Sequence, residues 1–273
     1  MLPYFKKYSI IACVIGIAPS ILVTTVYPLF TGTIMAASVG GLLLLFVIFF
    51  ASLTLGVNMM ERKAEKDTTD MLSLYNDKCD PQALIDKGKT VAANITFPCK
   101  DTGAWFMSYY AQAMLDVGNK DDALNVERGL RSSMQAAKKP QAKVGILVNL
   151  IPLVDKTGGT EQAMQLIQEG LQISEGDPSP IAATRRAYLT SQDKIMKVRA
   201  SGDALEAVKM DESIIGSTEY PMRIRVEAAW AQARAYFRLA DAAGERTALD
   251  FVIKHGNKLA LVSQAQQRLS ALG

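Results

Sequence analysis

Residues 104–124 read AWFMSYYAQAMLDVGNKDDAL, and residues 229–249 read AWAQARAYFRLADAAGERTAL. The two segments align without a gap and share Ala, Trp, Asp, Ala and Leu at matching positions. Each contains the end of one helical stretch, a Gly-containing turn and the start of the next stretch. Such stretches, with apolar residues at helical spacing, fill the C-terminal part of the chain, and no sustained period-two alternation of β-branched residues accompanies them. The sequence therefore predicts an all-α fold.

The turn-and-helix pattern repeats about every 40 residues. The glycines assigned to the turns are Gly118, Gly158, Gly202 and Gly244. An alanine follows each turn near the start of the next helix, at Ala123, Ala163, Ala207 and Ala248, with spacings of 40, 44 and 41 residues. A helix pair exposes an apolar face that only a neighbouring pair can bury. A period near 40 therefore predicts an α-solenoid of stacked pairs.

Ala111 and Ala123 occupy positions where the tetratricopeptide repeat (TPR) has a small residue and an alanine. The chain resembles this family over residues 100–255, although its spacing is nearer 40 than the usual 34. Trp105 stands two residues further from Ala123 than the family's Trp would, and other α-solenoids of similar period fit the pattern as well. The resemblance implies a TPR-like repeat domain over residues 71–273. The first helix of each pair is then expected to line a groove, and this groove would hold a peptide segment of a partner.

The N-terminal region has a different composition. The 53 residues from Tyr8 to Met60 contain no Asp, Glu, Lys or Arg. A membrane-spanning helix needs about 20 apolar residues, so this length predicts a transmembrane helical hairpin in residues 1–60. Its spans are expected at about residues 9–26 and 34–57. A cleaved signal peptide is the alternative, but a second apolar stretch follows without a polar break.

The basic residues indicate an orientation. Those that flank the predicted hairpin are Lys6, Lys7, Arg62, Lys63 and Lys66, and the turn between the spans has none. By the positive-inside rule, both termini are expected in the cytoplasm of a bacterial-type cell, at the inner membrane. Residues 61–70 form a charged helical linker. Cys79 and Cys99 are expected to be free thiols, which suits a reducing compartment.

Small residues recur every four positions in the second predicted span, at Gly32, Ala36 and Gly40. Such a stripe lets another helix approach closely. It could pack against the chain's own first span, or it could support self-association or docking to another membrane protein. Because neither span contains an ionisable residue, the hairpin is expected to be an anchor rather than a transport path.

The candidate partner-binding groove follows from the TPR resemblance. If the repeats align, Trp105 and Trp230 occupy equivalent places near the start of first helices, and Tyr109 and Gln112 lie one and two turns beyond Trp105. Exposed aromatic residues in a groove make good binding anchors. The alternative is that both Trp side chains pack between repeats.

A second candidate surface is basic. One predicted helix carries Arg185 and Arg186 together with three further bases, and Asp193 is the acid that opposes them. Such a run could receive an acidic peptide or anionic lipid headgroups. It could equally be a solvated helix face.

The chain offers little for catalysis or metal binding. Its single histidine, His255, is expected near a helix C-terminus, and Cys79 and Cys99 lack the C-x-x-C spacing of a zinc site. Gly88-Lys89-Thr90 lacks the earlier glycine and the strand of a phosphate-binding loop. We therefore predict no enzyme, no cofactor and no metal. The formal net charge of +3 argues against a nucleic-acid partner.

Together these features predict a membrane-anchored, non-catalytic scaffold or adaptor that binds another protein or peptide at its cytoplasmic groove. The alternative is a subunit or assembly factor of a larger membrane complex, which associates through its transmembrane helices. The two differ in which half of the chain suffices for binding.

Overall fold

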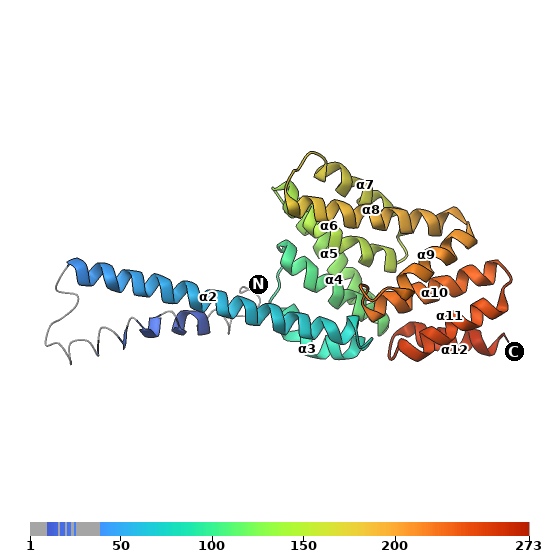
Figure 1. The fold of residues 1–273 in the computed structure, drawn as a ribbon, viewed down its shortest axis with the longest axis horizontal. Helices are drawn as coiled ribbons and strands as arrows, with labels where there is room; N and C mark the ends of the chain where they lie inside the picture. The colour runs from blue at the N-terminus through green and yellow to red at the C-terminus, as the bar shows by residue number, and fades with distance from the viewer. Residues whose placement is uncertain (1–9, 16, 20, 23–24, 26–38, 273) are drawn as a thin grey trace. The chain divides into compact units, whose positions relative to one another are not determined.

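The computed structural model describes residues 10–15, 17–19, 21–22, 25 and 39–272 (Figure 1). Every regular element in this part of the chain is an α-helix, which confirms the predicted all-α class. The bounds are α2 (Val39–Asn76), α3 (Pro81–Ala93), α4 (Asp101–Asp116), α5 (Lys120–Ala136), α6 (Pro140–Lys156), α7 (Thr160–Ser174), α8 (Pro180–Ser201), α9 (Ala204–Gly216), α10 (Met222–Arg238), α11 (Ala242–His255) and α12 (Ala260–Ser270). The chain forms two compact units, Met1–Asp70 and Met71–Gly273.

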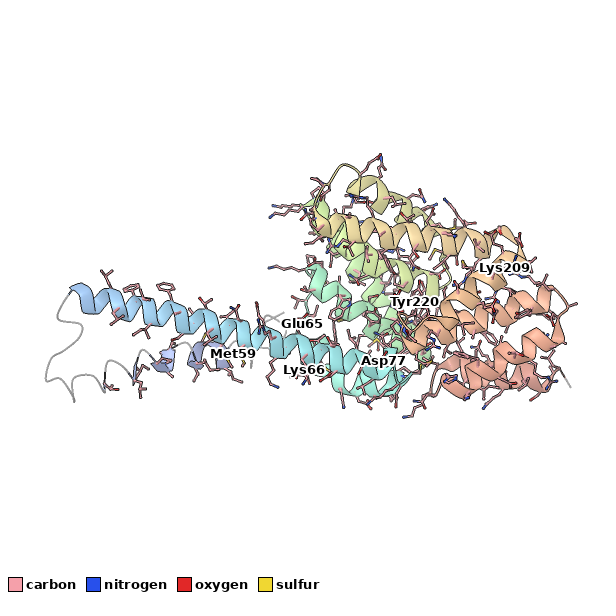
Figure 2. The ribbon with its side chains drawn as sticks, viewed as in Figure 1. Met59, Glu65, Lys66, Asp77, Lys209 and Tyr220 are labelled. Atoms are coloured by element: carbon pink, nitrogen blue, oxygen red, sulfur yellow. The ribbon has the colours of Figure 1, made fainter. Side chains whose placement is uncertain are left out.

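The first unit corrects the prediction of a two-span transmembrane hairpin. Among the described residues, no helix is both apolar enough and long enough to cross a membrane. A span needs about 20 residues in one apolar helix. Before α2, the longest run of described helical residues is 10–15. The helix α2 then continues without a break from apolar side chains such as Met59 to charged ones such as Glu65 and Lys66 (Figure 2).

Helix starts in the second unit follow local capping chemistry. The Asp80 carboxylate accepts a hydrogen bond from the backbone N–H of Ala83, and Pro81 opens α3. The Ser179 hydroxyl accepts one from the N–H of Ala182 at the start of α8. Both caps satisfy N–H groups that have no partner within the helix.

The second unit consists of helix pairs that stack as in an α-solenoid (Figure 1). Helix α4 packs on α5, α6 on α7 and α10 on α11, and first helices also contact the next pair, as α4 does with α6. The alanines predicted at the tight crossings are all buried, with exposures of 0–3%: Ala123, Ala163, Ala207 and Ala248.

Two local details differ from the sequence-based expectation. Gly244 lies inside the first turn of α11, and Ala240 takes the positive φ of 56° in the preceding turn. An added Cβ at position 244 would lie 2.6 Å from the Tyr236 ring, so a larger residue there would force the ring to move. A proline inside a helical stretch, such as Pro152, favours a break in the helix, but α6 runs through it.

The Ala163→Leu substitution tests the register of the repeats. Ala163 is fully buried at the start of α7, so three additional carbon atoms would overpack the crossing and lower the free energy of unfolding by about 1–3 kcal/mol. Chemical denaturation of the full chain measures this loss. Ala187→Leu, at an exposed site on α8, is the matched control and should change stability by about 0.5 kcal/mol or less.

The end of the second unit lies against its beginning. The backbone N–H of Lys258 donates to the Cys79 carbonyl over 3.1 Å, and the Asn257 side-chain amide donates to the Lys78 carbonyl over 2.7 Å. The Lys258 ammonium lies 2.6 Å from the Asp80 carboxylate. The loop between α11 and α12 therefore contacts the loop between α2 and α3, and the stacked pairs close on themselves. We call these three interactions the loop contact.

Candidate functional site

Side chains from four helices form a charged cluster inside the second unit. The charge network is defined as Tyr75 of α2, Asp116 of α4, Lys156 of α6, and Arg223 and Glu227 of α10. The Lys156 Nζ lies 2.9 Å from both carboxylate oxygens of Asp116 and 3.2 Å from the nearer oxygen of Glu227. The Tyr75 hydroxyl donates to Asp116 over 2.6 Å and accepts from Lys156 over 3.0 Å.

Arg223 connects α10 to the first pairs of the repeat. Its Nη1 donates to both carboxylate oxygens of Glu227, at 2.8 and 3.0 Å, and more weakly to the Gln112 amide oxygen at 3.3 Å. Its Nε donates to Asn76 over 3.2 Å. The guanidinium carbon lies 4.7 Å from the centre of the Tyr75 ring, within cation–π range. Only 3% of Arg223 is exposed.

The network holds Lys156 and Glu227 in their ionised forms. Burial alone would lower the pKa of Lys156, but Glu227, Tyr75 and Asp116 raise it above its usual value. Burial would raise the pKa of Glu227, but Arg223 and Lys156 outweigh it and lower this pKa to about 2. Tyr75 stays neutral, because burial raises its pKa. The charges of the two basic and two acidic side chains compensate each other. The arrangement therefore suits a structural connection between helices rather than proton transfer near pH 7.

The lowered pKa of Glu227 predicts a loss of stability in acid. The folded-state value of about 2 lies below the ordinary 4.5, so the contribution is complete above pH 5 and disappears as pH falls toward 2. We expect the stability difference between the wild type and Glu227→Gln to shrink by roughly 2 kcal/mol between pH 7 and pH 3. Urea denaturation at both pH values measures it. A difference independent of pH would contradict the ion pairing.

The predicted groove residues on α4 lie beside this network. The rings of Trp105 and Tyr109 meet edge to face, with centroids 6.3 Å apart. The Arg223 guanidinium carbon lies 5.7 Å from the Tyr109 ring centre, and Gln112 is buried where it accepts from Arg223. Trp230 is half-buried on α10, the helix that carries Arg223. The Arg223 side chain of α10 therefore contacts two of the residues that the sequence predicts for the groove.

The predicted basic surface on α8 is largely engaged in contacts between helices. Arg185 donates to the Asp101 carboxylate over 3.1 Å and to the carbonyl of Gln141. Arg186 donates to the carbonyl of Asp177 over 2.8 Å, beyond the C-terminus of α7. Both side chains are half-buried. The two arginines therefore connect α8 to the preceding pairs.

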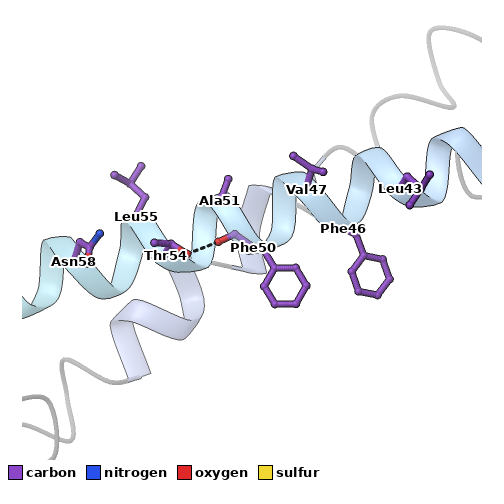
Figure 3. Close-up of a pocket in the computed structure, with 8 residues that line it drawn as sticks. All are labelled: Leu43, Phe46, Val47, Phe50, Ala51, Thr54, Leu55 and Asn58. Carbon is purple, nitrogen blue, oxygen red and sulfur yellow. Dashed lines mark hydrogen bonds between the residues drawn. The ribbon is translucent and has the colours of Figure 1, made fainter.

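The first unit presents an apolar surface on α2 (Figure 3). It is lined by Leu43, Phe46, Val47, Phe50, Ala51, Thr54, Leu55 and Asn58. The Phe46 and Phe50 rings stack with centroids 5.9 Å apart, and both are exposed. Of the predicted packing stripe, Gly32 and Ala36 lie outside the described residues, and Gly40 lies in α2. The described close approach in this unit is instead at Gly56, where an added Cβ would lie 2.9 Å from the Ala12 carbonyl.

Sequence reasoning missed the charge network. Arg223 and Glu227 stand four residues apart in one helix, as in many surface ion pairs. The repeat period could have indicated the network. The sequence separation is 41 residues from Tyr75 to Asp116 and 40 residues from Asp116 to Lys156, close to the repeat length. Polar residues in equivalent places on successive first helices face the same axis of a solenoid, and they can therefore meet.

Comparison of the chain with protein-family models, with curated proteins and with solved structures gives no match. The TPR resemblance therefore depends on this chain's own residues. Within the described residues, no group of three or more His, Cys, Asp and Glu side chains could hold a metal ion.

Proposed function

We propose that this chain is a membrane-associated, non-catalytic scaffold whose TPR-like repeat domain binds another protein. The observation that carries the proposal is the contrast between the surfaces of the two units. Of nineteen exposed large apolar side chains in the described part of the chain, thirteen lie between Ile10 and Met59. Apolar surface on this scale is typical of a membrane or protein contact, whereas the second unit buries its apolar residues in stacked helix pairs.

The geometry of the second unit supports binding rather than chemistry. Its most concentrated set of titratable groups is the charge network, in which Lys156 and Glu227 keep their charges across the physiological pH range. A general acid or base instead needs a pKa near the working pH. Buried alanines at equivalent crossings support the TPR-like relationship, in which first helices line the binding groove.

A crosslinked pull-down of the full chain from native membranes tests the scaffold. Three forms are compared: the wild type, Trp105→Ala/Trp230→Ala and Phe46→Asp/Phe50→Asp. We expect a stoichiometric partner that the Phe variant retains and the Trp variant loses. Trp105→Phe/Trp230→Phe is the matched control and should retain it. A thermal melt of each form excludes unfolding as the cause. If the Trp105→Ala/Trp230→Ala variant still captured the partner, this result would contradict binding at the groove.

The second candidate function is a subunit of a larger membrane complex that associates through the apolar face of α2. The stacked and exposed Phe46 and Phe50 favour it. In the same pull-down, this function predicts the opposite result, because the Phe46→Asp/Phe50→Asp variant would lose the partner and the Trp variant would keep it.

We also propose that Met71–Gly273 lies in the cytoplasm, beneath the inner membrane of a bacterial-type cell. Cys79 and Cys99 are both free thiols, which suits a reducing compartment. Protease added to sealed, right-side-out cells should leave this part intact until the cells are lysed. Its digestion without lysis would contradict the placement.

A further inference from the structure

Two sides of helix α2 have different surroundings. One side contains Gly56, where an added Cβ would lie 2.9 Å from the Ala12 carbonyl and 3.2 Å from the Ile15 side chain, so the segment around these two residues covers it. The other side is open in the described part of the chain. We call it the α2 face, and it consists of Leu43, Phe46, Val47, Phe50, Ala51, Thr54, Leu55 and Asn58 (Figure 3).

The spacing of the α2 face fits one other helix. Its residues recur at intervals of three and four, or one, which keeps them on one side of an α-helix over about four turns. Val47 and Thr54 stand seven residues apart along its middle, and Leu43 and Phe50 beside them are also seven apart. Two apolar positions that repeat every seven residues form the seam of a two-helix coiled coil. The α2 face therefore suits a helix with the same spacing.

The exposed area of the α2 face matches what a pair of such helices needs. Its large apolar residues keep 56–64% of their surface exposed: Leu43, Phe46, Val47, Phe50 and Leu55. This corresponds to roughly 600 Å² per copy and about 1,200 Å² for two copies, the lower end of the range for a specific protein contact. A globular partner would need a broader surface, whereas a second helix would not.

Asn58 favours a second copy as the occupant. Its side chain is exposed and makes no hydrogen bond among the described residues, whereas the Thr54 hydroxyl already donates to the Phe50 carbonyl over 2.8 Å (Figure 3). A carboxamide carries both donors and an acceptor, so it is complementary to another carboxamide. A second Asn58 beside it would satisfy these groups, whereas a lipid acyl chain offers them no partner.

We propose that two copies of this chain pair in parallel through the α2 face. Parallel pairing sets Val47, Thr54 and Asn58 of one copy against the same residues of the other. It is also the orientation that two copies share when both associate with one membrane from the same side, and for this orientation the inference rests on the proposed membrane association. Met59 and the exposed apolar residues between Ile10 and Leu22 lie outside the α2 face and stay available to the membrane.

Disulfide formation between copies tests the pairing. Thr54→Cys is introduced into the full chain in a Cys13→Ser background, and native membranes are oxidised with copper phenanthroline. Met59→Cys is the matched control, because Met59 is 50% exposed on the same helix but points away from the α2 face. The background without an added cysteine measures the contribution of Cys79 and Cys99. Membrane and soluble fractions are scored separately, so failed membrane association is distinguishable from failed pairing.

We expect Thr54→Cys to give at least about tenfold more disulfide-linked dimer than Met59→Cys, because a disulfide needs Cβ atoms about 4 Å apart. Adding Val47→Asp to Thr54→Cys should lower the yield at least about tenfold, because it buries an unpaired carboxylate in the seam. Adding Met59→Asp instead places the same charge outside the α2 face and should change the yield less than about twofold.

Equal yields at positions 54 and 59 would indicate random collision and would overturn the proposal. A Thr54→Cys chain that stays monomeric in the membrane fraction would also overturn it, and would assign the α2 face to lipid or to a different protein. So would a yield that Val47→Asp does not change. A chain found only in the soluble fraction would contradict the membrane association, and its disulfide yield would still decide the pairing.

Discussion

Replacing Arg223 with Met is expected to lower the free energy of unfolding by about 3–5 kcal/mol. The side chain is almost fully buried, and its removal leaves the Glu227 carboxylate with Lys156 alone and the oxygens of Asn76 and Gln112 without their donor. Breaking a buried pair is costly because the remaining charge keeps its desolvation penalty. Urea denaturation of the full chain, followed by circular dichroism, measures the loss.

Arg131→Met is the matched control for this substitution. Arg131 also pairs with a glutamate four residues away in its own helix, at 2.9 Å from Glu127, but 32% of its side chain is exposed against 4% for Arg223. Its loss should lower stability by about 0.5 kcal/mol. Equal effects of the two substitutions would show that Arg223 contributes no more than a partly exposed arginine in an ion pair of the same spacing.

Phe106→Ala is expected to destabilise the second unit by about 3–5 kcal/mol. Phe106 is 1% exposed, stacks on Tyr110 at 5.9 Å, and approaches α3 so closely that a Cβ at Gly88 would lie 3.0 Å from its ring. Removing the ring leaves a cavity between α3 and α4, and the rigid backbones on either side cannot fill it. The same denaturation experiment measures the effect.

Phe237→Ala controls for the loss of a phenyl ring as such. Phe237 is 58% exposed on α10, and its main described neighbour is the guanidinium of Arg268 at 4.3 Å. Its removal should lower stability by about 1 kcal/mol or less. A loss at Phe106 no larger than this would contradict a tightly packed contact between α3 and α4.

Local chemistry made much of the second unit predictable. Asp80-Pro81 and Ser179-Pro180 mark helix starts because a cap needs only the next three residues. Ala163 could be placed at a buried crossing because the repeat period carries the same packing from one pair to the next. Gly244 was wrongly assigned to a turn because glycine suits both a turn and a close approach to a ring such as that of Tyr236, and the sequence does not distinguish the two.

The contact between the two ends of the repeat domain could not be predicted from local sequence. Lys258 and Asp80 are 178 residues apart, and their meeting depends on the sum of small rotations over several helix pairs. The same rotations bring Arg223 onto Tyr109 and Gln112. The sequence could suggest a groove on the first helices, but not that the Arg223 side chain of α10 contacts two of its predicted residues. Arg185 likewise looked like a surface charge because its partner, Asp101, is 84 residues away.

The transmembrane prediction failed for a different reason. Composition over residues 8–60 gave a run without charge long enough for two spans. A span also requires one continuous helix of suitable length and apolarity, and the described residues contain none. What persists is the exposed apolar surface around Phe46 and Phe50, on which the proposed membrane association depends.

A double-mutant cycle on Lys156 and Glu227 measures directly whether charge holds α6 and α10 together. The free energy of unfolding is determined for the wild type, Lys156→Met, Glu227→Gln and the double variant. The 3.2 Å contact predicts that the two losses are not additive, with a coupling energy of about 1.5 kcal/mol or more. Additive losses, with a coupling within about 0.3 kcal/mol of zero, would contradict an ionic connection between α10 and the first helix pairs.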